Sequence, residues 1–180
     1  RNLREAIQCH FFCHLCAEIE QVGCGYSQAY LGQNLEPYYQ ADKAAGLITY
    51  DDAVFMFENL VIKLNEIGYY YGEQVALQNS ADLGQSISLG GETEDGEDAT
   101  AEMDFVILDA QKYLMLPQPP LTLVYSNRTN GKLLEKVLDV IVAELEEIRA
   151  RYGDERRTEI VMSSEDIDIE DMIVEEDMVV

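Results

Sequence analysis

Apolar residues recur at α-helical spacing along much of this chain. The first helix is expected over residues 1–22, where one stripe is formed by Leu3, Ile7, Phe11, Leu15 and Ile19. Glycines, prolines and capping residues bound the other helices that the sequence predicts. These are expected over residues 37–45, 53–67, 99–116 and 132–152.

Two short runs predict β-strands. Residues 86–89 alternate polar and apolar side chains before a Gly-Gly pair, and residues 121–125 follow a proline-rich corner. The run between them, residues 99–116, retains its helical pattern, whereas residues 69–83 read as a polar loop rich in tyrosine. The expected fold class is therefore α/β and mostly helical, with few strands.

The helix expected over residues 132–152 carries a heptad seam. Apolar side chains alternate at spacings of four and three, at Leu134, Leu138, Ile141, Leu145, Ile148 and Tyr152. Such a seam predicts packing against a second helix, and a homodimer is one way to supply it. Elsewhere, Thr49 with Asp52 three residues later predicts an N-cap close to a capping box.

Composition and charge narrow the range of partners. The 180 residues are 47% hydrophobic, with 35 acidic and 12 basic side chains and a formal net charge of −23. Such acidity repels a phosphate backbone, so we expect no direct nucleic-acid binding. No run reaches the roughly twenty apolar residues of a membrane span. Four cysteines, all within the first 24 residues, cannot cross-link a chain of this length, and nothing in the sequence implies an oxidising compartment. We therefore expect a reduced, cytoplasmic protein and no membrane partner.

Three of those cysteines have the spacing C-x-x-x-C-x-x-C. Cys9, Cys13 and Cys16 match the pattern with which radical S-adenosylmethionine enzymes hold an iron–sulfur cluster, which makes an activase one hypothesis. A helix would have to unwind for the three thiolates to converge, so buried structural cysteines are the expectation we favour. Cys24 lies on an expected loop and could be reactive.

Other ligand-like patterns are weaker. His10 and His14 are four residues apart but lack a carboxylate partner motif, so we assign no metal site to them. The acids Asp95, Asp98, Glu102 and Asp104 have no EF-hand spacing, and we expect them to form a solvated helix N-terminus. The tail run at residues 166–171 lacks the glycine of a calcium loop.

A longer pattern resembles a known family. Gly-Gln-Ser-Ile-Ser-Leu-Gly-Gly at residues 84–91, an acidic turn with Asp-Gly, a helix ending Leu-Pro-Gln-Pro-Pro and then Leu-Thr-Leu-Val-Tyr together resemble part of a glycyl radical enzyme barrel. That family includes pyruvate formate-lyase and the radical dehydratases. The resemblance covers about residues 1–141 and implies a partial slice of an α/β barrel. It also implies that Gln85 and Ser86 line the substrate side, although an ordinary strand end is the alternative.

The resemblance sets expectations for chemistry. A complete enzyme would carry a glycyl radical installed by a radical S-adenosylmethionine activase, and would act on a small polar substrate. The 180 residues contain no Gly-Cys-x-Glu segment and no Arg-Val-x-Gly-Tyr-like loop, and Cys24 is followed by Gly25 and Tyr26. We therefore assign no catalytic residue and no cofactor to this chain. The expectation is an incomplete segment, from a truncated reading frame, that is inactive alone.

The last part of the chain resembles a different protein. Residues 144–160 and the acidic, apolar run to residue 180 resemble the end of the coiled-coil arm of bacterial DNA gyrase A. The expected division is thus residues 1–141, a partial glycyl radical enzyme domain, and residues 142–180, a gyrase-like connector with an acidic, β-prone tail. The alternative function is a coiled-coil interaction fragment of a topoisomerase.

Overall fold

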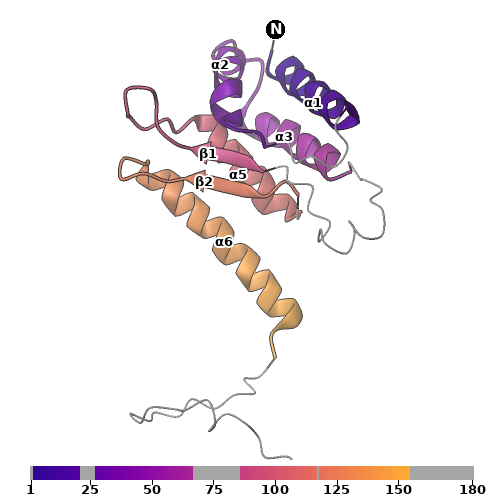
Figure 1. The fold of residues 1–180 in the computed structure, drawn as a ribbon, viewed down its shortest axis with the longest axis vertical. Helices are drawn as coiled ribbons and strands as arrows, with labels where there is room; N and C mark the ends of the chain where they lie inside the picture. The colour runs from indigo at the N-terminus through magenta and orange to yellow at the C-terminus, as the bar shows by residue number, and fades with distance from the viewer. Residues whose placement is uncertain (1, 21–26, 67–85, 117, 155–180) are drawn as a thin grey trace, which may run out of the picture.

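The computed structural model describes residues 2–20, 27–66, 86–116 and 118–154. Five helices and two strands lie within these ranges (Figure 1). In chain order they are α1 (Leu3–Glu20), α2 (Leu31–Ala44), α3 (Tyr50–Asn65), β1 (Ile87–Gly90), α5 (Glu102–Leu114), β2 (Leu121–Val124) and α6 (Gly131–Tyr152). The prediction of a mostly helical α/β fold with two short strands is confirmed for this part of the chain.

The two strands form a small parallel sheet. β1 and β2 pair in register from Ile87 with Leu121 to Gly90 with Val124. The connection between them runs through α5, which is the crossover that parallel strands need. Gln28 extends the sheet on the other edge of β1 through an isolated parallel bridge to Ile87. The sheet is thus a short parallel unit backed by helices.

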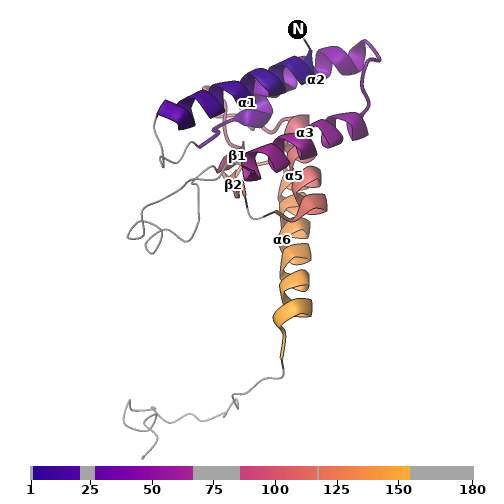
Figure 2. The same ribbon diagram turned by 90° about the vertical axis from the view of Figure 1, so that its right-hand side faces the viewer.

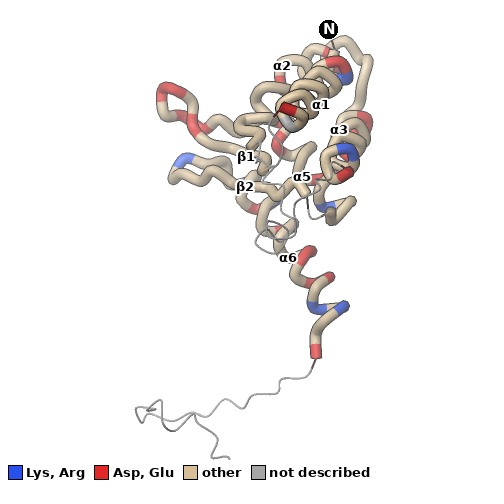
Figure 3. Tube along the Cα trace, turned by 45° about the vertical axis from the view of Figure 1, so that its right-hand side comes forward, with Lys and Arg blue, Asp and Glu red and all other residues tan. Residues whose placement is uncertain are grey.

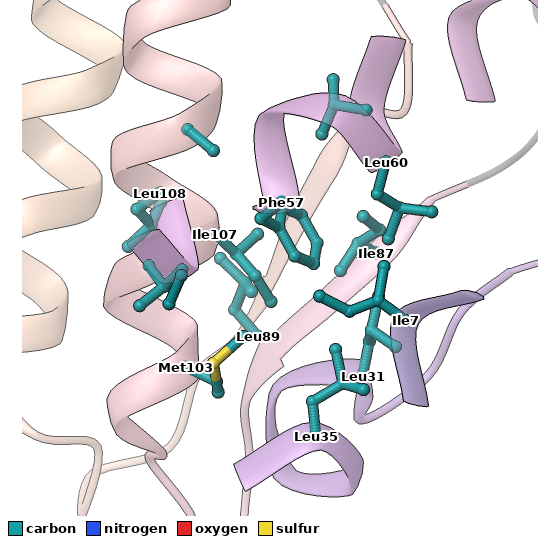
Figure 4. Packing of buried hydrophobic residues seen from close by; sticks show 14 of the residues in the cluster. Ile7, Leu31, Leu35, Phe57, Leu60, Ile87, Leu89, Met103, Ile107 and Leu108 are labelled. Atoms are coloured by element: carbon teal, nitrogen blue, oxygen red, sulfur yellow. The ribbon is translucent and has the colours of Figure 1, made fainter. Parts of the chain in front are cut away.

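The hydrophobic core lies between this sheet and the helices α1, α2, α3 and α5. Figure 4 shows Phe57 of α3 beside Ile107 of α5, with Ile87 and Leu89 of β1 close by. Phe57, Ile87 and Ile107 are fully buried. Side chains from six elements therefore meet in one cluster, to which α6 contributes only Leu133 and Val140 from its first half.

Helix α2 begins six residues before the predicted start. We expected a helix only after Pro37, yet α2 starts at Leu31 and contains Pro37 in its interior. Leu31, Leu35 and Tyr39 are buried at spacings of four, so one face of α2 packs on the core. Because this packing outweighs the hydrogen bond that proline removes, the helix continues through it.

Two acidic side chains accept hydrogen bonds from backbone amides at the N-termini of helices. At α3 the predicted capping box forms: the Thr49 hydroxyl accepts from the Asp52 amide at 3.2 Å, and the Asp52 carboxylate accepts from the Thr49 amide at 2.8 Å. At α1 the carboxylate of Asp42, from α2, accepts from the Leu3 amide at 2.7 Å. A negative charge at a helix N-terminus is favourable, so Asp42 also ties α1 to α2.

Helix α6 leaves the core along its length (Figure 2). Asn130 caps its start by accepting from the Lys132 amide at 2.9 Å, and the helix ends at Tyr152, as predicted. The predicted seam is largely uncovered: Leu145 is 58% and Ile148 54% exposed. The expected division at residue 141 falls inside this continuous helix, and no boundary in the backbone marks it.

Candidate functional site at the start of β1

The two faces of the sheet differ in character. On one face Ile87 and Leu89 are buried against the core. On the other, Ser86 and Ser88 are half-buried, and Ser88 is the register partner of Thr122, which is exposed. Because side chains alternate along a strand, the three hydroxyl groups lie on the same face. The sheet therefore presents a row of hydroxyls on the side away from the core.

Ser86 is fixed by contacts to the segment before α2. Its carbonyl oxygen accepts from the Gln28 amide at 2.7 Å, and its hydroxyl lies 3.1 Å from the Ser27 hydroxyl. The Ser88 amide donates in turn to the Gln28 carbonyl at 3.3 Å. These bonds place Ser27 and Ser86 side by side at the beginning of β1. Gln85, the other predicted substrate residue, lies outside the described residues.

A histidine of α1 contacts Gln28, the residue that pairs with β1. The amide oxygen of Gln28 lies 2.8 Å from Nε2 of His10 on α1, and Gln28 is 3% exposed. Burial lowers the pKa of His10, while the hydrogen bond to Gln28 opposes that shift. A neutral imidazole donating from Nε2 fits both observations. His10 therefore positions Gln28, and sequence reasoning did not find this pair because its members are eighteen residues apart.

The other end of β1 holds a buried carboxyl group. Asp104 is 1% exposed, and its Oδ2 accepts from the amides of Ala101 at 2.9 Å and Gly90 at 3.3 Å. Burial raises the pKa of Asp104 to about 6, and the two backbone hydrogen bonds oppose the rise. Gly32 of α2 leaves no room for a side chain, because a Cβ there would lie 2.1 Å from Oδ1 of Asp104.

The prediction that the acids near α5 form a solvated helix start is therefore wrong for Asp104. Glu102, by contrast, keeps 34% of its side chain exposed in the first turn of α5, where it accepts from the hydroxyl of Tyr39 at 3.0 Å and from Lys43 at 2.5 Å. Both acids face α2, which packs across the first turn of α5. Only the packing of α2 on α5 distinguishes them from solvent-facing acids, and the local sequence carries no sign of it.

The remaining acids of this group lie on the loop after β1. Figure 3 shows acidic residues gathered on this loop, next to the turn that follows β2. Arg128 of that turn donates to the carbonyl oxygen of Gly96 and pairs with Glu97 at 3.1 Å. Asp95 is exposed, as predicted, whereas Asp98 is half-buried and accepts from the Thr100 hydroxyl at 2.7 Å. These hydrogen bonds and this ion pair are internal contacts that a folded loop makes with itself and with the neighbouring turn.

The prediction that the three cysteines of the first helix are buried is also wrong. Cys9, Cys13 and Cys16 lie on α1 as expected, but all three are exposed. The stripe of α1 that faces the core contains Leu3, Ile7 and the fully buried His14. The three thiols lie on a different side of the helix, so periodicity gives them a common face but not a buried one. Cys24 lies outside the described residues.

Neither histidine has the environment of a metal ligand in this structure. His10 is engaged with Gln28, and His14 is enclosed by the core. Within the described ranges, no group of three or more His, Cys, Asp or Glu side chains is placed to hold a metal ion. Of the helices described, none is both long and apolar enough to cross a membrane.

Comparison with known proteins identifies the family. The profile of pyruvate formate lyase-like proteins matches residues 1–173. The chain is 31% identical over 136 residues to the 4-hydroxyphenylacetate decarboxylase glycyl radical subunit of Clostridium scatologenes, and 30% identical over 140 residues to indoleacetate decarboxylase of Tractidigestivibacter scatoligenes. This chain belongs to the pyruvate formate lyase-like family.

Solved structures of glycyl radical enzymes are similar to the described part of this chain. The B12-independent glycerol dehydratase of Clostridium butyricum superposes with a TM-score of 0.73 and 30% identity over 78% of this chain. The hydroxyproline dehydratase of Clostridioides difficile gives a TM-score of 0.70 at 26% identity over 77% of this chain. The match covers 18% of each of those chains, and 15 to 16% of the two decarboxylases. The described fold is thus consistent with a slice of a much larger glycyl radical enzyme.

The expected gyrase-like connector finds no support in these comparisons. The family profile continues through residue 173, well beyond the expected join at residue 141. The decarboxylase matches cover 75 to 77% of the chain. The glycyl radical enzyme resemblance is confirmed, and the boundary between the two expected domains stays a prediction.

Proposed function

We propose that this chain supplies one wall of the substrate pocket of a glycyl radical lyase or dehydratase, with Gln85 and Ser86 on the substrate side. The observation that carries the proposal is the hydroxyl face of the β1–β2 sheet, where Ser86, Ser88 and Thr122 point away from the core. Hydroxyl groups both donate and accept hydrogen bonds, so they suit a substrate with several oxygen atoms.

The substrate is expected to be small and polar. The relatives named above are decarboxylases of aromatic acetates and dehydratases of glycerol and hydroxyproline. All of these substrates carry carboxylate or hydroxyl oxygens. In our proposal Ser86 contacts such an oxygen, and Ser27 and Gln28 hold Ser86 in place. His10 acts as a positioning residue through Gln28.

We further propose that the 180 residues do not turn over a substrate by themselves. A glycyl radical supplies the unpaired electron in this family, but the sequence contains neither a matching glycine loop nor a Gly-Cys-x-Glu segment. The residues present do not fit that group, and no radical step is assigned to them. The activase would act on a glycine outside these residues, in a complete cytoplasmic enzyme.

A binding titration tests the pocket proposal. We expect glycerol or trans-4-hydroxy-L-proline to shift the backbone amide signals of Ser86, Ile87 and Ser88 in a two-dimensional NMR spectrum of the 180-residue chain. Ser86→Ala should weaken these shifts because it removes one hydrogen-bonding group. Thr93→Ala is the matched control, since Thr93 is an exposed hydroxyl on the loop beyond the other end of β1.

Two results would count against the proposal. Equal ligand-induced NMR shifts in Ser86→Ala and Thr93→Ala would show that Ser86 does not contact the substrate. For the inactivity claim, the chain is incubated anaerobically with a glycyl radical activase and S-adenosylmethionine. A glycyl radical doublet in its electron paramagnetic resonance spectrum would overturn that claim, and no doublet is expected.

A second candidate function rests on the exposed half of α6. Leu138, Ile141, Leu145 and Ile148 are each between 44% and 58% exposed on the predicted heptad seam. We propose that this seam associates with the same seam of a second copy, as coiled-coil helices do. Such a homodimer is independent of the gyrase resemblance. It is tested with the seam variants described in the Discussion.

A further inference from the structure

An apolar groove lies between α5, β2 and α6, alongside the exposed seam of α6. Its volume is about 520 Å³. Met115, directly after α5, and Leu121 of β2 line one side of the groove, whereas Ile141, Glu144 and Ile148 line the other side from α6. The groove is therefore suited to an apolar occupant, and one edge of it carries negative charge.

Glu144 gives this edge a charge without a partner. The side chain is half-buried, and no ion pair joins it to any other residue in the described ranges. Glu147, which also lines the groove, pairs with Arg151 on its own helix. Because a partly desolvated charge is stabilised by an opposite charge nearby, the groove favours an occupant with a basic side chain beside an apolar stripe.

The exposed part of the seam is complementary to itself when two copies of α6 run in opposite directions. Ile141, Leu145, Ile148 and Tyr152 are all exposed. A two-fold axis midway between Leu145 and Ile148 brings each of these two residues against the other on the second copy, and it brings Ile141 against Tyr152. All four side chains then have an apolar neighbour.

The charges on α6 fit the same arrangement. Arg151 follows Glu144 by seven residues, so both lie on the side of the helix that borders the groove. In the antiparallel pair they face each other across the contact between the copies. A parallel pair would instead bring Glu144 against Arg149. Because α6 projects from the rest of the described fold (Figure 2), a parallel pair would also place two chains of net charge −23 side by side, whereas the antiparallel pair keeps them at opposite ends.

We propose that this groove receives the last turns of α6 from a second copy of the chain, in the antiparallel direction, with Glu144 paired to Arg151 of that copy. The guanidinium of Arg151 has five N–H donors, so it can contact Glu144 and retain Glu147 of its own helix. The two-fold axis creates two such grooves, which closes the assembly as a dimer. The inference rests on the association of the seam proposed above, to which it adds the groove, the direction and the ion pair.

Sedimentation equilibrium of the 180-residue chain tests the direction by exchanging charges. Glu144→Arg and Arg151→Glu should each weaken dimerisation about tenfold, because each brings like charges together twice in a symmetric dimer. The double variant restores opposite charges, and its dissociation constant should return to within about threefold of the parent value. Arg149→Glu is the matched control. It makes the same change of charge on the side of α6 away from the groove, and should shift the dissociation constant by less than about threefold.

Met115→Asp tests the groove separately from the seam. Met115 lines the groove but lies outside α6, and its φ of 47° is in the left-handed region, which aspartate tolerates. The variant places a charge in the apolar lining and should weaken dimerisation by about tenfold or more. Tyr113→Asp is the control, since Tyr113 is exposed on α5 and does not line the groove. Circular dichroism verifies that every variant remains folded.

The outcomes separate this inference from the simpler association of the seam. Dimerisation that Leu145→Asp abolishes but Met115→Asp leaves unchanged would overturn docking in the groove and leave the seam contact standing. Weakening by Arg149→Glu, with no recovery in the double variant, would show a parallel pair and overturn the direction. A parent chain that sediments as a monomer at all concentrations overturns both the seam contact and the groove.

Discussion

Helices α5 and α6 carry similar apolar spacing but differ in how much of it is covered. Along α5, Met103, Val106, Ile107, Leu108 and Ala110 are all at most 2% exposed. Along α6 only Leu133 and Val140 are buried. The difference arises because α5 packs against α2, α3 and α6, whereas α6 contributes only Leu133 and Val140 to the core.

This contrast separates two meanings of an apolar stripe. In α5 the stripe contributes to the stability of this chain, because its side chains leave water on folding. In the second half of α6 the same pattern contributes little within one chain, because those side chains remain half in water. A stripe on a helix therefore defines a face, and only the neighbouring elements determine whether the face is a core or a contact for another molecule.

The test with the largest expected effect removes an equal number of side-chain carbon atoms from α5 and from α6. Ile107→Ala should lower the free energy of unfolding by about 2–5 kcal/mol, because it leaves a cavity in the core. Leu145→Ala should change it by less than about 0.5 kcal/mol, because Leu145 is 58% exposed. Urea denaturation followed by circular dichroism measures both.

If Ile107→Ala does not fold, Ile107→Val provides the milder deletion, with an expected loss of about 1 kcal/mol. Equal losses for the Ile107 and Leu145 variants would contradict the contrast between the helices.

A second test concerns the buried carboxyl group at the start of α5. The pKa of Asp104 is raised to about 6 in the folded chain. Its protonated form is therefore favoured by folding, so the stabilising effect is complete below the unfolded pKa near 4 and is lost as the pH rises through 6. Asp104→Asn keeps the size and an acceptor oxygen. Relative to the parent, it should gain on the order of 3 kcal/mol between pH 4 and pH 7.

The measurement is the difference in melting temperature between parent and Asp104→Asn across that pH range. The parent alone is not informative, because the pKa values of Asp52 and Glu102 are lowered and give the opposite slope. Asp95→Asn, on the exposed loop, is the control and should show no pH-dependent difference. A constant difference for Asp104→Asn would mean that Asp104 does not titrate in this window.

Much of the fold follows from the sequence because it is determined locally. The capping box at Thr49 and the helix end at Gly46, whose φ is +66°, depend on residues within one turn. The strands at β1 and β2 follow from alternation and from the proline corner before Leu121. The family resemblance over most of the chain can also be read from motifs in a fixed order, as the profile match confirms.

The features that escaped prediction depend on contacts between distant residues. Pro37 lies within a helix because Leu35 and Tyr39 pack on the core, and Asp104 is buried because α2 crosses the start of α5. The cysteines were expected inside because small thiols often are, yet only the position of the neighbouring helices decides which side of α1 faces the core. For the site, Ser86 was predicted and its partners Ser27 and Gln28 were not.

A smaller effect is expected at the helix caps. Thr49→Ala removes the hydroxyl that accepts from the Asp52 amide, and should cost about 1 kcal/mol. Thr49→Ser retains a hydroxyl and should cost much less.

Asn130→Ala removes the corresponding cap of α6, where the second half of the helix makes few contacts. We expect it to fray α6 locally, visible as faster amide hydrogen exchange in α6 than in α3 of the Thr49 variant.

The smallest effect on the stability of one chain, and the most informative about α6, is expected from a charge on the seam. Leu145→Asp should leave the unfolding free energy of the monomer within about 0.5 kcal/mol, because Leu145 is exposed. If the seam joins two copies, the same change places two carboxylates in the contact and abolishes concentration-dependent association in sedimentation experiments. Leu138→Asp should act in the same way.

Ala150→Asp adds an equal charge to an exposed position of α6 away from the seam, and should leave association intact. The high negative charge of the chain opposes any pairing of copies, so association should strengthen as salt is raised. Equal association in the parent and in both seam variants would show that the seam does not join two copies. The exposed apolar side chains of α6 would then have to pack against a surface other than a second copy of this seam. The contrast with α5 would reflect the absence of that other surface from the structure.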